Sequence, residues 1–211
     1  MERGTGAVTD TIPFTGSPRL RSRDLSVRLD TPQFEWFSLS GWAFWGHDFD
    51  FEEWSPATIL FGGSELSIRP TNRLRLSATY ELQQYYRHSD GRLVSSLQLP
   101  RLKLEYQLSR AIFLRLVGRY DALAINPLRD DTRTGGAILL RDPATGIPVR
   151  TGTVRDNSFR LESLFSFQPS PGTVGFLGYG SLMEEPQAFR FRGLQRRSDG
   201  FFLKLSYLWR C

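Results

Sequence analysis

The sequence predicts an all-β fold: an antiparallel up-and-down meander of about nine to ten strands that forms a transmembrane β-barrel or part of one. Three observations predict this fold. Apolar and polar residues alternate along almost the whole chain, which is the period of a β-strand. The connections between the predicted strands alternate between short and long. Tyrosine and tryptophan gather at both ends of the predicted apolar face.

The clearest alternation lies in residues 73–83, where leucine, alanine and tyrosine face one way and arginine, serine and glutamate the other. We expect bulges at 61–65 and 99–101, where the apolar face changes parity. Residues 188–192 share the parity of the last strand and are expected to continue it. The predicted strands cover residues 20–30, 33–45, 57–69, 73–87, 92–108, 111–122, 158–168, 173–182 and 200–210.

The composition fits one folded domain. Hydrophobic residues make up 40% and charged residues 23% of the 211 residues, and only two of the 27 basic residues are lysines. The net charge of +5 fits nucleic acid, an anionic membrane surface or simply an arginine-biased genome, and the charge alone does not choose between them. We expect a poorly ordered segment at 1–19 and a β-barrel domain at 20–211, the C-terminal portion of a larger barrel.

The connections indicate a sheet with two different ends. Long connections are predicted at 46–56, at about 122–157 and at 183–199, and short ones lie between them. Every second connection of a meander lies at the same end of the sheet. Short periplasmic turns and long extracellular loops are typical of outer-membrane barrels.

The two faces of such a barrel have different tasks. The apolar face meets lipid, and the polar face lines the interior. Charges of both signs on the polar face can pair across strands. We predict that the lumen is lined by Arg75, Glu81, Lys103, Glu105, Arg115, Arg119, Arg160, Glu162 and Lys204.

Aromatic residues predict where the membrane surfaces lie. Tyrosine and tryptophan prefer the interface between lipid and water. We predict one aromatic girdle near the short turns and another near the long loops, and the expected partners are membrane lipid and lipopolysaccharide. The girdles comprise Trp36, Trp42, Trp45, Tyr85, Tyr86, Tyr106, Tyr207 and Trp209.

The chain ends on "FFLKLSYLWRC", with aromatics at alternate positions. This stretch resembles the closing strand through which the outer-membrane assembly machinery recognises barrels, except that Arg210 and Cys211 follow the last aromatic. Four sequence segments resemble the C-terminal barrel of the bacterial DUF5916 family. They lie within residues 66–94, 100–121, 158–181 and 198–210. The resemblance covers most of residues 55–210. It implies a place in the bacterial outer membrane and an upstream domain, which in that family is similar to carbohydrate-binding family 9 and which this sequence lacks.

The remaining motifs predict no catalytic site. The acidic stretch at 47–53 has no spacing known to bind a metal and is expected to be a solvated loop. The stretch at 129–149 is expected to be an extracellular loop with a small hairpin around "DPATG". The only cysteine is Cys211, and His47 and His88 both fall in predicted loops, so no nucleophile, base and acid can be grouped.

We therefore expect a non-catalytic barrel segment that serves in transport through a pore or in surface anchoring, without cofactor or metal. Nucleic-acid binding is disfavoured because arginine and aromatic residues alternate onto opposite faces. The alternative is a soluble antiparallel β-sandwich that binds carbohydrate. It predicts that Leu74, Leu76, Leu114 and Leu116 lie in a core. An enzyme would need a convergent pocket that the sequence does not reveal.

Overall fold

The computed structural model describes residues 11–16, 19 and 21–207, and it consists of strands joined by turns and loops. The prediction of an all-β antiparallel meander is confirmed. Among the described residues, no helix has the length and apolarity to span a bilayer. The strands are β1 (Arg23–Asp30), β2 (Phe37–Asp50), β3 (Ser55–Thr71), β4 (Leu74–Arg87), β5 (Leu93–Gln98), β6 (Arg101–Gln107), β7 (Ile112–Ile125), β8 (Leu139–Arg141), β9 (Pro148–Arg150), β10 (Val154–Ser170), β11 (Thr173–Glu184) and β12 (Gln195–Tyr207).

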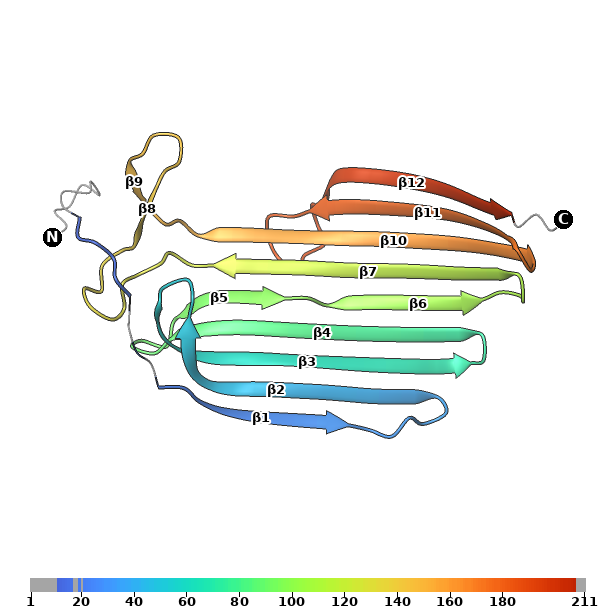
Figure 1. Ribbon diagram of the computed structural model, residues 1–211, viewed down its shortest axis with the longest axis horizontal. Helices are drawn as coiled ribbons and strands as arrows, with labels where there is room; N and C mark the ends of the chain where they lie inside the picture. The colour runs from blue at the N-terminus through green and yellow to red at the C-terminus, as the bar shows by residue number, and fades with distance from the viewer. Residues whose placement is uncertain (1–10, 17–18, 20, 208–211) are drawn as a thin grey trace.

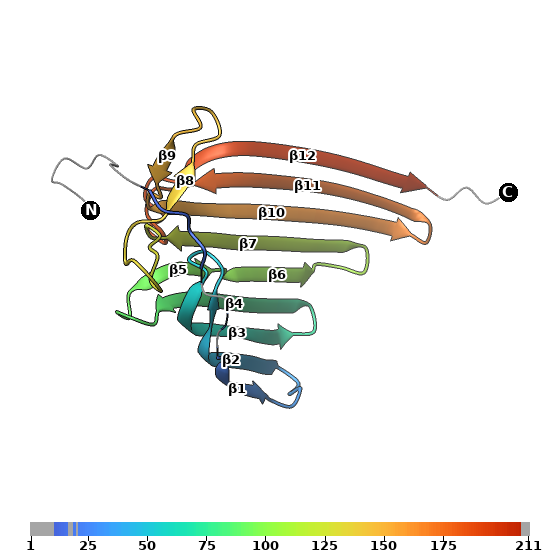
Figure 2. The same cartoon turned by 60° about the vertical axis from the view of Figure 1, so that its left-hand side comes forward.

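Ten of these strands form one sheet, in the order β1-β2-β3-β4-β5-β7-β10-β11-β12. Strands β5 and β6 lie end to end in one row, because both pair with β4 and with β7 (Figure 1). All neighbours are antiparallel, so the edge strands β1 and β12, eight rows apart, run in the same direction. Figure 2 shows a single twisted layer of strands.

The expected irregularities are confirmed in one place and wrong in two. The row predicted at 92–108 breaks at Leu99 and Pro100, where proline cannot donate to the ladder. No bulge exists at 61–65, because the register of β3 with β2 and β4 runs without a shift from Ile68 to Ala57. Residues 188–192 do not extend β12, which begins at Gln195.

The lengths of the connections differ between the two ends of the sheet, but less regularly than predicted. The β3–β4 and β10–β11 connections are two residues long, and 126–153 is long and contains the small β8–β9 hairpin around the predicted "DPATG" turn. The β2–β3 connection, however, has only four residues, because both strands continue beyond the predicted boundaries. We call the end with residues 51–54, 88–92, 126–153 and 185–194 the loop end, and the opposite end the turn end.

One face of the sheet is apolar across almost its whole width. Directly opposed residues share a face, and one such row passes through β2, β3, β4, β6, β7, β10, β11 and β12. The face is exposed: Leu102 is 59% and Leu203 is 69% accessible. The row consists of Phe37, Ile68, Leu76, Leu104, Leu116, Ser163, Tyr179 and Phe201. We call this the apolar face and its reverse the polar face.

The hydrophobic core is small and sits at the loop end. Val94 of β5 packs with Leu128 and Ile138 of the long loop, and Tyr85 and Ile125 adjoin them. The loop therefore folds over the polar face at this end. None of the four leucines that a sandwich core would contain belongs to this cluster, and Leu116 is 43% exposed.

Candidate functional site

All nine residues predicted to line a lumen lie on the polar face. The register aligns Arg75 with Glu105 and Glu105 with Arg115. The register also pairs Glu162 with Val117, and Val117 with Lys103. The structure thus brings the predicted set onto one face of the sheet across β4, β6, β7, β10 and β12, alternating with the leucines of the apolar face.

Charges on the polar face are only partly paired. Lys103 Nζ lies 3.1 Å from Glu105 Oε2, and Arg119 Nε lies 2.6 Å from Asp121 Oδ1. Arg101, Arg119 and Arg160 stand directly opposite one another in β6, β7 and β10. Like charges directly opposed on a sheet are destabilising. This row therefore gives the polar face a local positive charge that attracts anions.

The structure places four of the eight predicted girdle residues on the apolar face. Trp45, Tyr86, Tyr106 and Tyr207 lie on the apolar face, near its two ends. Trp36 precedes β2 at the turn end and contacts Phe37, with the ring centroids 4.4 Å apart. Trp209 lies outside the described residues.

Trp42 and Tyr85 were predicted to lie on the apolar face, and this is wrong. Both point to the polar face. The ring of Trp42 covers Gly63 so closely that a Cβ there would lie 2.5 Å from the indole nitrogen. Tyr85 packs edge-on against Phe61, with the ring centroids 5.2 Å apart, beside the core at the loop end. At Trp42, the glycine and the neighbouring aromatic ring fill space together, and this packing accounts for the place of the ring on the polar face.

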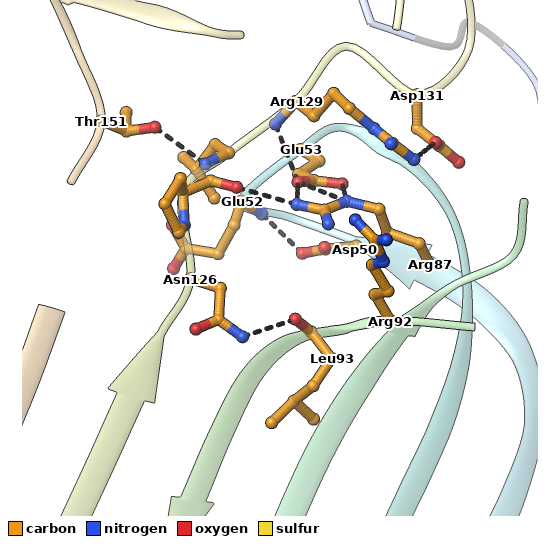
Figure 3. A network of polar contacts seen from close by, with 12 residues as sticks. Asp50, Glu52, Glu53, Arg87, Arg92, Leu93, Asn126, Arg129, Asp131 and Thr151 are labelled. Carbon is orange, nitrogen blue, oxygen red and sulfur yellow. Dashed lines mark hydrogen bonds and ion pairs between the residues drawn. The ribbon is translucent and has the colours of Figure 1, made fainter. Parts of the chain in front are cut away.

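The prediction that the acidic stretch at 47–53 is a solvated loop is also wrong in part, because two of its carboxylates are buried. Asp50 and Glu53 are each 1% exposed. Glu53 forms an ion pair with Arg87, whose Nε lies 2.9 and 2.8 Å from its two carboxylate oxygens. The backbone N–H of Arg129 also donates to Glu53 (Figure 3). The turn between β2 and β3 is thus fastened to β4 and to the long loop.

Asp50 is the unusual group of this network. Its Oδ1 accepts the N–H of Glu52 at 2.8 Å, and its buried Oδ2 has no partner within the described part of the chain. Asp50 lies at the loop end, past Trp45. Burial, with a smaller contribution from the neighbouring carboxylates of Glu53 and Glu52, raises the pKa of Asp50 from 3.8 to about 6.

We predict that this carboxyl makes folding stability depend on pH. Between the unfolded pKa of 3.8 and the folded pKa of about 6, the folded protein binds the proton more tightly, so stability rises as the pH falls through this window. The expected gain is about 1–3 kcal/mol. Denaturant unfolding at pH 7 and pH 4.5 measures it. Asp50→Asn should remove the gain, whereas Asp24→Asn on the exposed strand β1 should retain it; equal slopes in both variants would contradict the assignment.

A second buried contact holds the β11–β12 loop against the apolar face near the loop end. The hydroxyl of Tyr120 donates to Glu185 and accepts the N–H of Phe189 at 3.0 Å. Phe189 packs against the Tyr120 ring in a tilted arrangement, with centroids 4.6 Å apart, and Phe191 packs edge-on against it. Phe189 and Phe191 both have positive φ, so tertiary packing imposes their backbone conformation.

Sequence reasoning missed these contacts. Glu53 and Arg87 are 34 positions apart, and Tyr120 and Glu185 are 65 apart. No group of three or more possible metal ligands occurs among residues 11–16, 19 and 21–207. No family model matches the chain, and no curated protein or solved structure matches it.

Proposed function

We propose that this sheet is part of the wall of a β-barrel in the bacterial outer membrane, with its apolar face towards lipid and its polar face towards an interior. The single observation that carries the proposal is the exposed apolar face, which covers almost the whole width of the sheet from β2 to β12. Soluble monomers rarely expose apolar patches above a few hundred Å². A lipid environment removes that cost.

The lengths of the strands support the proposal. Strands β2, β4 and β7 each have 14 residues, and β10 has 17. A tilted strand crosses a bilayer with about 9–11 residues. A soluble sandwich would cover the apolar face with a second layer, and the described residues form one main sheet, with the β11–β12 loop lying against this face near Tyr120.

The chemistry of the interior favours a pore or a surface anchor over catalysis. The polar face carries arginine, lysine and glutamate, and in a barrel such residues shape the interior and select which solutes pass. The resemblance of residues 55–210 to the DUF5916 barrels agrees with this role. In this proposal β12 is the strand that the assembly machinery receives, and lipid and lipopolysaccharide contact the outer face.

Spin labels on neighbouring residues test the proposal. In a Cys211→Ser background, Leu116→Cys places a label on the apolar face and Arg115→Cys places one on the polar face. The full chain is reconstituted in phospholipid vesicles. We expect the label at 116 to collide with oxygen, which concentrates in lipid, and the label at 115 with a water-soluble nickel complex. A chain that stays monomeric without detergent, with label 116 immobile and shielded from both agents, would instead establish a sandwich core.

A further inference from the structure

A cavity of about 1270 Å³ lies at the loop end of the sheet, open to solvent. Residues 11–14, the end of β4, the start of β5 and the long loop with its β8–β9 hairpin surround it. Six arginines line it: Arg87, Arg92, Arg129, Arg133, Arg141 and Arg150. Asp130 is the only acidic residue among the described residues that line it. Figure 3 shows three of these arginines, Arg87, Arg92 and Arg129, close to the buried acidic turn.

Acidic neighbours neutralise part of this charge. Glu53 pairs with Arg87, and Arg129 Nη2 lies 2.7 Å from Asp131 and 3.1 Å from Asp90. Asp90 also lies 3.7 Å from Arg92. Six guanidinium groups thus line the cavity with one carboxylate, that of Asp130, among the described residues, and Glu53, Asp90 and Asp131 pair with three of these arginines from outside the lining. Arginine is therefore the predominant charged residue of the described lining.

Some of the donors around the cavity remain unused. The buried Nε of Arg129 has no hydrogen-bond partner in the described part of the chain. Arg141, on β8, forms no ion pair there. A buried N–H without an acceptor is costly, and the guanidinium of Arg141 can donate to an anion that enters the cavity. The lining also includes Phe14, Leu93 and Ile138, which can contact an apolar part of a ligand.

We propose that this cavity binds a ligand that carries phosphate groups, either a lipid headgroup or a soluble phosphate ester. The planar guanidinium fork matches phosphate oxygens in pairs, which is why arginine is favoured where phosphate is recognised. The volume exceeds that of a single phosphate and fits a ligand with several charged groups and a carbon skeleton. The site uses arginines at the loop end, so it stands whether or not the sheet spans a membrane.

Titration of the folded full chain with inorganic pyrophosphate tests the site, in non-ionic detergent if the chain requires it. We expect saturable binding with one site per chain, weakened by added salt because the attraction is electrostatic. Arg141→Gln and Arg92→Gln each remove one guanidinium from the lining and should weaken binding about tenfold. Arg110→Gln removes an exposed arginine from the turn end and should leave binding unchanged.

A competition arm separates the two sources of phosphate. Displacement of pyrophosphate by phosphatidic acid, but not by phosphatidylcholine, in mixed micelles would identify a lipid headgroup. Retention of pyrophosphate against both lipids would identify a soluble ester. The proposal is overturned if no saturable binding occurs, or if Arg110→Gln weakens binding as much as Arg141→Gln does.

Discussion

Replacement of Glu53 by alanine should lower the free energy of unfolding by about 3–5 kcal/mol, among the largest losses from a single substitution in this chain. The reason is that Arg87, whose side chain is only 7% exposed, would keep a buried charge without its carboxylate. The backbone N–H of Arg129 would lose its acceptor as well. The carbonyl of Pro127, 2.8 Å from Arg87 Nη2, cannot neutralise the guanidinium.

Denaturant unfolding of Glu53→Ala and of Glu52→Ala makes the comparison direct. Glu52 is the exposed neighbour, so its loss should cost less than about 0.5 kcal/mol. A double variant, Glu53→Leu with Arg87→Met, should recover part of the loss because it removes both charges together. A loss below about 1 kcal/mol for Glu53→Ala would mean that the pair behaves as a solvated surface ion pair.

Substitution of Leu116 by arginine should cost about 2–4 kcal/mol when the protein is folded in lipid. Leu116 lies in the middle of the apolar face, in register with Leu104 of β6. In water, a charge at this 43% exposed position would cost little, because the guanidinium could extend into solvent. In a bilayer the same group has no water to reach, so the size of the loss reports the environment of the face.

The control is a leucine on the reverse face of the sheet. Leu164 of β10 lies directly opposite Arg115 on the polar face. Leu164→Arg should cost at most about 1 kcal/mol, through repulsion between like charges across the strands. Urea unfolding of both variants from lipid vesicles measures the difference. Equal losses at 116 and 164 would be evidence against lipid contact at the apolar face.

Most strands of the main sheet were predictable because they are long and alternate with a period of two over most of their length. One face of β4 carries Leu74, Leu76 and Tyr80, and no helical pattern competes with that alternation. The division of the fifth row was predictable too, because Pro100 cannot continue a ladder. The ends of β2 and β3 were not, since Asp50 and Ser55 pair there although neither residue type favours strands.

The residues buried at the loop end could not be derived from local pattern. A cluster of Asp and Glu is usually solvated, and only the arrival of Arg87 from β4 and of the 126–129 segment makes burial of Glu53 favourable. The position of the Trp42 ring likewise depends on a residue distant in the sequence, because the ring lies over Gly63 of the next strand. Both outcomes depend on which strands become neighbours, and the period of the sequence does not specify this.

The shared direction of β1 and β12 has a consequence for any closed ring built from this sheet. If these two edges joined each other, their pairing would be parallel, because nine rows that alternate in direction begin and end with the same polarity. Bacterial single-chain barrels have an even number of antiparallel strands. A ring of that kind therefore needs an odd number of further strands from outside the described residues, and the strands that meet β1 and β12 must both run opposite to them.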